Sequence, residues 1–125
     1  MARRASWKGE SGILTVQIDG KTVCPAARFQ QRVSGKYKLR ILCGLNGWRR
    51  YGELKSGLLT GSIGTAEIAR RVLSRELKTL VTMGMVRRRD HQVFPLKVEY
   101  RLTRKGRTFL PVISVIHRWG LRHLV

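Results

Sequence analysis

Basic and hydroxyl side chains recur at helical spacing in the second half of the chain. The set is Arg70, Arg71, Ser74, Arg75 and Lys78. Positions i, i+1, i+4, i+5 and i+8 share one face of an α-helix. An arginine guanidinium can bond guanine O6 and N7 in the major groove, and serine and lysine can reach phosphates. The pattern predicts a helix face that contacts duplex DNA; the alternative is an ordinary solvated charged face.

A second basic set lies in a predicted β-ribbon of residues 86–90 and 98–102, joined by a connection that holds Pro95. Near its tip, Arg89, His91 and Lys97 are expected to contact phosphate or the flanking minor groove. Plain solubility is the competing explanation. Further DNA-backbone contacts are expected from Lys36, Lys38 and Arg50, although solvation of helix ends would explain Lys36 equally well.

Cys24 directly precedes Pro25, which is favoured in the first turn of a helix. The positive end of the helix dipole and the nearby Arg28 favour a thiolate at Cys24. The alternative is a small apolar residue that seals the helix start. Cys43 lies in an apolar helix and is expected in the core.

Other chemistry is not expected. The histidines His91, His117 and His123 have no cysteine or carboxylate partners at metal-ligand spacing. The chain shows no Ser/His/Asp grouping, phosphate-binding loop or dinucleotide fingerprint. We therefore expect neither an enzyme nor a bound metal or cofactor.

The first part of the chain predicts a hairpin followed by two helices. Asp19-Gly20 between β-branched residues predicts a β-hairpin over residues 13–23, whereas residues 1–9 have no such anchor and are expected to be mobile. A short helix is expected from Pro25 to residue 33. A buried helix should follow from about residue 36 and end at Asn46-Gly47.

The second part predicts three more helices. Residues 52–56 form one or two helical turns, 57–64 a glycine-rich loop, and 65–83 a long basic helix that Gly84 ends. Thr103 caps a last helix from 104 to about 119, bent at Pro111. Its apolar stripe predicts a dimer interface, with core packing in one chain as the alternative: Phe109, Val112, Ile113, Ile116 and Trp119.

The composition indicates one folded basic domain. The 125 residues include 26 Lys and Arg but only 7 Asp and Glu, a net charge of +19. A polyanionic partner follows, nucleic acid first and an anionic membrane surface second. No run approaches the roughly 18 apolar residues of a membrane span, and no signal peptide is evident, so we expect a cytoplasmic protein without a membrane partner.

The chain resembles the HxlR-type winged helix-turn-helix transcription regulators of bacteria and archaea over about residues 24–120. The matching segments are Cys24-Pro25, GKYKL at 35–39, IL at 41–42, RYGEL at 50–54, RVLSREL at 71–77, GMVR at 84–87, Pro95, VEYRLT at 98–103, Gly106, Leu110-Pro111 and Trp119-Gly120. The resemblance implies a nucleoid-associated homodimer that binds duplex DNA. It also implies redox sensing at Cys24 and a possible small-molecule or electrophile effector.

Three departures from the family pattern stand out. The segment between Lys55 and Glu67 is longer than usual, so the turn of the helix-turn-helix motif is enlarged. Ala69 replaces the usual capping Ser or Thr, so the helix is expected to start near Thr65. The usual double proline of the wing is Pro95-Leu96.

The sequence therefore predicts an α+β, mainly helical fold: a winged helix-turn-helix with an added N-terminal β-hairpin and a C-terminal dimerisation helix. Residues 1–23 are expected to be an appendage and 24–125 the DNA-binding domain. The predicted function is sequence-specific regulation of transcription by a homodimer. The alternative is a sequence-indifferent nucleic-acid-binding protein, chromatin-like or RNA-binding.

Overall fold

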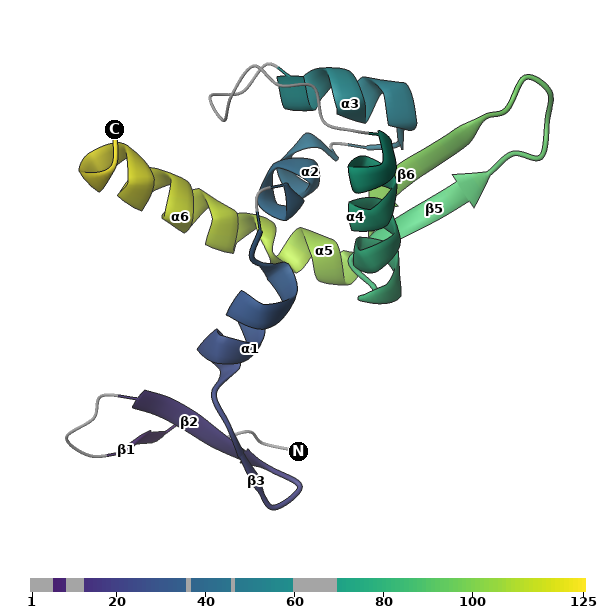
Figure 1. The fold of residues 1–125 in the computed structure, drawn as a ribbon. Helices are drawn as coiled ribbons and strands as arrows, with labels where there is room; N and C mark the ends of the chain where they lie inside the picture. The colour runs from purple at the N-terminus through teal and green to yellow at the C-terminus, as the bar shows by residue number, and fades with distance from the viewer. Residues whose placement is uncertain (1–5, 9–12, 36, 46, 60–69) are drawn as a thin grey trace. The chain divides into compact units, whose positions relative to one another are not determined.

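The computed structural model describes residues 6–8, 13–35, 37–45, 47–59 and 70–125. The chain divides into two compact units, Met1–Gly35 and Lys36–Val125. The described residues are mainly helical and include two three-stranded antiparallel sheets, which confirms the predicted α+β class (Figure 1). The expected division between residues 23 and 24 stays a prediction.

The first unit consists of a sheet and one helix. Its strands are β1 (Ser6–Lys8), β2 (Ile13–Ile18) and β3 (Lys21–Val23), in the order β1-β2-β3, followed by α1 (Pro25–Val33). Asp19 (φ +51°) and Gly20 (φ +73°) both adopt the left-handed conformation, as a type I′ hairpin turn requires. The predicted hairpin is confirmed.

The expectation of mobility over residues 1–9 is wrong for residues 6–8. Trp7 lies opposite Leu14, so β1 pairs with the free edge of β2, whose backbone groups would otherwise lack partners. Residues 1–5 and 9 lie outside the described part of the chain.

The second unit contains five helices in its described residues. They are α2 (Lys38–Gly44), α3 (Tyr51–Leu59), α4 (Arg70–Thr82), α5 (Arg104–Thr108) and α6 (Leu110–His123). Helices α2, α3 and α4 and the wing strands each contribute to one apolar core, whose members include Ile41, Leu42, Leu54, Leu73, Leu77, Leu80, Val86 and Leu102. This core fixes α4 against α2 and against the start of the wing.

Cys43 corrects one expectation about this core. The residue is exposed overall, whereas its neighbours Ile41 and Leu42 are fully buried. At about 100° per residue, Cys43 points about 200° away from Ile41 around α2. A helix of seven residues that packs on one side therefore leaves position 43 outside the core.

Helix α3 is longer than the sequence indicates, because residues 57–59 are helical and not part of a loop. The Glu53 carboxylate accepts a hydrogen bond from the Arg50 backbone N–H at 3.2 Å, which caps the start of the helix. A single Gly57 costs about 1 kcal/mol in a helix, too little to end one that is capped. Residues 60–69, with the expected start of the next helix near Thr65, lie outside the described residues.

The wing is a sheet of β4 (Arg49–Arg50), β5 (Val86–Asp90) and β6 (Val98–Leu102), in the order β4-β6-β5. The predicted ribbon is confirmed, with Arg88 opposite Tyr100 and Arg89 opposite Glu99. The segment directly before α3 supplies the third strand.

A hydrogen-bonded junction joins the end of α4 to the wing and to α5. Gly84 (φ +76°) ends α4 as predicted, and the Met85 N–H donates to the Leu80 carbonyl at 3.0 Å. The Thr103 hydroxyl donates to the Gly84 carbonyl at 2.5 Å, and Lys105 Nζ donates to the Met83 carbonyl at 2.8 Å. We call this set of contacts the Gly84–Thr103 junction.

The expected last helix is capped as predicted but is divided into two helices, and the break lies before Pro111. Thr103 Oγ1 accepts from the Gly106 N–H at 3.1 Å, which confirms the cap. At Phe109 the helix breaks into α5 and α6, with Pro111 in the first turn of α6, where its missing N–H costs nothing. Helix α6 then runs past Trp119 to His123. Among the described residues, no helix is both long and apolar enough to cross a membrane.

Candidate nucleic-acid interface

The five predicted recognition residues all lie exposed on α4: Arg70, Arg71, Ser74, Arg75 and Lys78. The only acidic residue of α4, Glu76, is turned towards α2, where its Oε2 lies 2.6 Å from Lys38 Nζ. Both side chains of this ion pair are mostly buried, at 14% and 13% exposure. The pair therefore leaves the exposed face of α4 purely cationic and uses the Lys38 charge inside the fold. The predicted contact of Lys38 with DNA stays a prediction.

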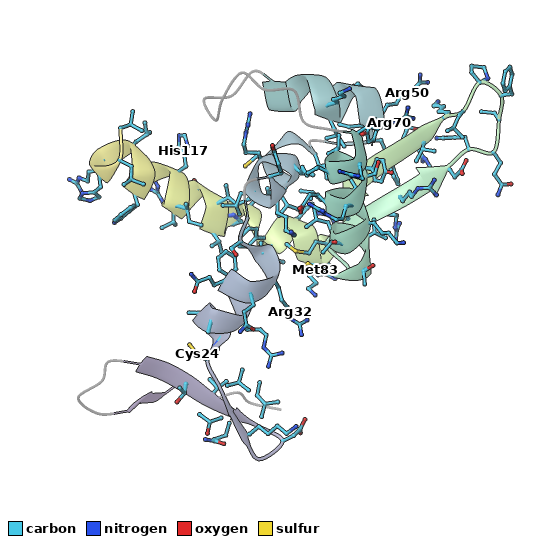
Figure 2. The ribbon with its side chains drawn as sticks, in the orientation of Figure 1. Cys24, Arg32, Arg50, Arg70, Met83 and His117 are labelled. Atoms are coloured by element: carbon cyan, nitrogen blue, oxygen red, sulfur yellow. The ribbon has the colours of Figure 1, made fainter. Side chains whose placement is uncertain are left out.

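Tyr51 positions the beginning of the described part of α4. Its hydroxyl donates a hydrogen bond to the Arg70 carbonyl at 2.9 Å, and Arg70 Cζ lies 5.8 Å from the centre of its ring. Figure 2 shows Arg50 and Arg70 at the same end of the second unit. Arg50 is exposed on β4, as a residue that contacts DNA must be. Lys36 lies outside the described residues.

A groove of about 440 Å³ separates α4 from the wing. It is lined by Ser74, Lys78, Val81, Thr82, Arg88 and Tyr100. Hydroxyl and cationic groups thus face each other across the groove, a donor set that suits a phosphate. Arg88 and Tyr100 were not among the predicted site residues, although strand alternation carries the signal: Arg88 shares a face of β5 with the buried Val86.

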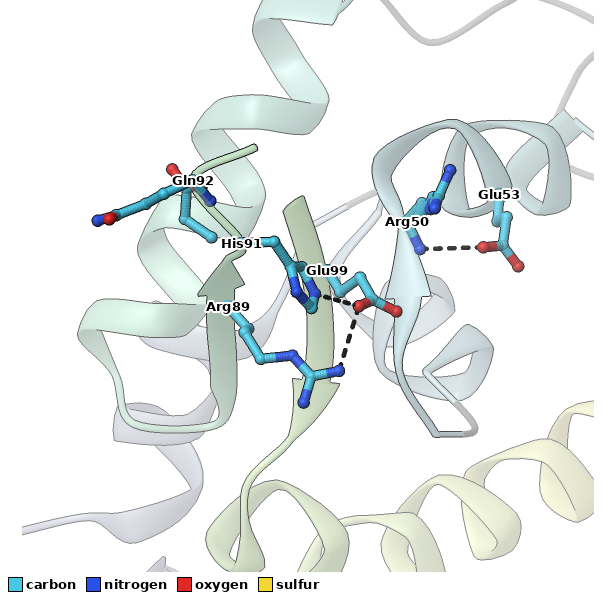
Figure 3. Close-up of polar contacts among 7 residues, drawn as sticks. Arg50, Glu53, Arg89, His91, Gln92 and Glu99 are labelled. Atoms are coloured by element: carbon cyan, nitrogen blue, oxygen red, sulfur yellow. Dashed lines mark hydrogen bonds and ion pairs between the residues drawn. The ribbon is translucent and has the colours of Figure 1, made fainter. Parts of the chain in front are cut away.

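Arg89 and His91 lie on the opposite face of the wing, where both contact the Glu99 carboxylate (Figure 3). Glu99 Oε1 lies 3.1 Å from Arg89 Nη2 and 2.5 Å from His91 Nε2. The Arg89 guanidinium also stacks over the Trp48 ring at 4.0 Å. The hydrogen bond from His91 does most to hold the pKa of Glu99 below its usual value; desolvation opposes this, and the Arg89 bond adds to it.

These contacts make Arg89 and His91 part of the wing's internal structure. Lys97 is half-buried, and its carbonyl accepts from the His91 backbone N–H at 3.0 Å. Contact of Arg89, His91 or Lys97 with DNA stays a prediction.

The predicted apolar stripe of α6 lies largely uncovered. Val112, Ile116 and Trp119 are 45%, 40% and 57% exposed, while Phe109 and Ile113 are half-buried. No residue of α6 is fully buried in the single chain. The stripe therefore has the area and the chemistry to pack against another surface.

Cys24 is half-buried at the N-cap of α1, where its side chain makes no capping hydrogen bond. Partial burial raises the pKa of the Cys43 thiol, which keeps that cysteine neutral. Within the described residues, no three side chains of His, Cys, Asp or Glu gather in a group that could hold a metal ion.

The chain matches one family model and several helix-turn-helix transcriptional regulators. The model of a family described as HxlR-like helix-turn-helix matches residues 32–125. The HTH-type transcriptional regulator YdzF of Bacillus subtilis is 38% identical over 91 residues, 71% of this chain and 77% of YdzF. YvaP of the same organism, also an HTH-type transcriptional regulator, is 35% identical over 102 residues, 78% of this chain and 86% of its own.

Solved structures give the same fold. The redox regulator HypR in its oxidised form superposes with a TM-score of 0.68 at 29% identity, over 80% of this chain and 97% of HypR. The reduced form of the transcriptional regulator YodB of B. subtilis gives a TM-score of 0.63 at 25% identity, over 81% and 94% of the two chains. These similarities confirm the predicted winged-helix architecture.

Proposed function

The chain belongs to the HxlR-like helix-turn-helix family, and from this premise we propose that it regulates transcription by binding specific duplex DNA sequences as a homodimer. The observation that carries the proposal is the exposed, purely cationic face of α4, which the Lys38–Glu76 ion pair frees of negative charge. We also propose that the protein acts on the nucleoid in the cytoplasm of a prokaryote and that it catalyses no reaction.

In the proposed complex, α4 enters the major groove, whose width of about 12 Å matches a helix with its side chains. Arg71 and Arg75 contact base edges. The DNA strand that separates the major from the minor groove then lies in the groove between α4 and the wing. Lys78 and Arg88 reach its phosphates from the two walls.

The tip of the wing follows over the minor groove. Its exposed side chains Val93, Phe94 and Leu96 are apolar, which suits contact with the sugars that wall the groove. The tip thus adds surface contact that is insensitive to sequence, while α4 reads the bases.

Two copies pair through the exposed stripe of α6. The two-fold axis of such a dimer places the two α4 helices on half-sites about 10 base pairs apart or a multiple of that distance. The uncovered Val112, Ile116 and Trp119 support this pairing. Cys24 is the proposed redox-sensing thiol, a role supported by the likeness to the redox regulator HypR.

The proposal is tested by selecting a tight-binding duplex from a random library with the full chain. Arg71→Ala and Arg75→Ala are expected to lose about 1–3 kcal/mol on the selected duplex and less on a scrambled one. Lys78→Ala and Arg88→Ala should weaken binding to both duplexes alike. Each should also make the slope of log affinity against log salt concentration shallower by about one unit, because one counterion fewer is released.

Arg118→Ala, on exposed α6, is the charge-matched control and should leave the preference between the two duplexes unchanged. Equal losses on both duplexes for Arg71→Ala and Arg75→Ala would contradict base recognition by α4. That result would favour the sequence-indifferent nucleic-acid-binding protein instead.

A further inference from the structure

Four arginines line a cleft of about 240 Å³ at the base of the wing. Its lining consists of Arg87, Arg101, Leu102, Thr103, Arg104 and Arg107. Arg87 and Arg101 lie directly opposite each other on β5 and β6, and like charges in such a pair repel. No carboxylate of the described residues lines the cleft. Among the lining residues, the positive charge of the four arginines therefore has no acidic partner, although Arg101 lies over the Trp48 ring and Arg107 donates to the Leu102 carbonyl.

This cleft is separate from the surface proposed for DNA. Successive strand residues point to opposite faces, so Arg87 faces away from the groove that Arg88 lines. A DNA strand seated beside Lys78 does not fill it.

A second cavity of about 530 Å³, with apolar and cationic walls, adjoins the cleft and shares Arg101, Leu102 and Arg107 with it. The rest of its lining is Leu42, Cys43, Leu45, Gly47 and Leu110, contributed by α2 and its end and by the start of α6. The raised pKa of Cys43 keeps the thiol protonated, so it forms a neutral wall. A volume between about 300 and 1,000 Å³ with mostly apolar walls and a few polar groups is typical of small-molecule sites.

We propose that the two cavities form one binding site for a small phosphorylated molecule with an apolar or aromatic body. The phosphate lies among Arg87, Arg101, Arg104 and Arg107, and the body lies against Leu42, Leu45 and Leu110. Several guanidiniums around one anion match a phosphate dianion, which accepts paired hydrogen bonds from arginine. The site does not depend on DNA binding.

The position of the site gives such a ligand access to the proposed dimer helix. Leu110 is the first residue of α6, so a bound apolar body contacts the base of that helix. The affinity for such a ligand would depend on the position of α6 relative to α2. A bound ligand could therefore act as an effector of the regulator.

The test uses 1-naphthyl phosphate, which joins a dianionic head to a bicyclic body, titrated into the full chain without DNA by calorimetry. Inorganic phosphate supplies the head alone and 1-naphthol the body alone. The variants are the double change Arg87→Gln/Arg104→Gln for the head and Leu110→Gln for the body. The control Arg118→Gln/Arg122→Gln removes the same charge from exposed α6, outside the site.

We expect 1-naphthyl phosphate to bind at least about tenfold more tightly than either fragment, with a loss of about tenfold or more in both site variants and little change in the control. Chemical shifts of the arginine side-chain N–H groups in the unmodified protein give a second measurement that needs no variant. They should move for the arginines of the cleft and not for Arg118.

Three results would overturn the proposal: no binding of 1-naphthyl phosphate, equal affinity for either fragment alone, or an equal loss in the control. The last would show that the general positive charge of the protein binds the ligand. None of these titrations contains DNA. A negative result would therefore not bear on the proposed DNA binding, and a failure of DNA binding would not bear on this site.

Discussion

The wing shows how neighbouring residues of the same type acquire different roles. Arg88 lines the groove beside α4, whereas Arg89 is stacked on Trp48 and bonded to Glu99. Strand alternation in the sequence already separates the two, and Arg88 could have been chosen because it shares a face with the apolar Val86. The partners of Arg89 could not have been predicted, because Trp48 lies 41 positions away (89 minus 48) and no local pattern brings it to the wing.

The Glu99 cluster makes the stability of the protein depend on acid. The folded-state pKa of Glu99 is lowered, chiefly by the bond from His91, so the unfolded chain binds the proton more readily. The stabilisation is fully present above the ordinary glutamate pKa of about 4.3 and is lost as pH falls through the lower, folded-state value.

Glu99→Gln cannot undergo this titration. Its urea midpoint should therefore fall less steeply than that of the unmodified protein between about pH 5 and pH 3. Identical pH profiles for the two proteins would show that Glu99 does not contribute to acid sensitivity.

The two cysteines predict different responses to oxidation. If Cys24 is the redox sensor, peroxide or diamide should weaken DNA binding by the unmodified protein but not by Cys24→Ser. The exposed but neutral Cys43 is the matched control, and Cys43→Ser should remain as sensitive as the unmodified protein. Affinity measured before and after oxidation decides this, and equal sensitivity in all three proteins would exclude the Cys24 switch.

At the scale of elements, helix ends were predictable wherever one residue determines them. Gly84 ends a helix and Thr103 caps one at the predicted position, whereas the bend predicted at Pro111 is a break between two helices at Phe109. The extension of α3 through Gly57 was not predictable, because it depends on the Glu53 cap and on a continuous run of backbone hydrogen bonds outweighing a single unfavourable residue.

Gly106 tests the close contact between α5 and the junction. A Cβ atom at this position would lie 2.2 Å from the Met85 carbonyl oxygen, so Gly106→Ala must push α5 away from the wing. We expect a loss of about 1–3 kcal/mol in the free energy of unfolding, measured with denaturant.

Gly52→Ala is the control for this substitution. Nothing lies within 4 Å of a Cβ atom at Gly52 in α3, and alanine there should be neutral or stabilising by up to about 1 kcal/mol. A Gly106→Ala protein as stable as Gly52→Ala would contradict the tight packing.

At the scale of the whole molecule, the net charge of +19 indicates a polyanionic partner but does not indicate which part of the surface binds it. The structure distributes the charge over the α4 face, the groove and the arginine cleft, and uses Lys38 and Arg89 internally. The sequence predicted the first of these surfaces from helical spacing. The cleft brings strand and helix residues together, so its existence depends on how β5, β6 and α5 pack.

The apolar stripe of α6 predicts a dimer that a single charged substitution in the stripe should dissociate. Ile116→Glu is tolerated in the single chain, where the side chain is 40% exposed, but would bury a carboxylate in the dimer. We expect a monomer in sedimentation experiments and a loss of at least about tenfold in affinity for a two-half-site duplex.

Ser114→Glu is the matched control, because helical spacing places residue 114 on the side of α6 opposite the stripe. It should remain dimeric. Dimers of both variants in sedimentation experiments would show that α6 is not the interface.

The Gly84–Thr103 junction has a consequence for engineering. The carbonyls of Met83 and Gly84 are bonded to Lys105 and Thr103, so the C-terminus of α4 is completed by residues that lie beyond the wing. A chimaera that takes only α4, residues 70–82, from a relative keeps both acceptors and both donors of the junction, because all four residues lie outside the exchanged segment. Operator preference should therefore be exchangeable between members of this family by moving residues 70–82 alone, with the contacts at the junction left in place.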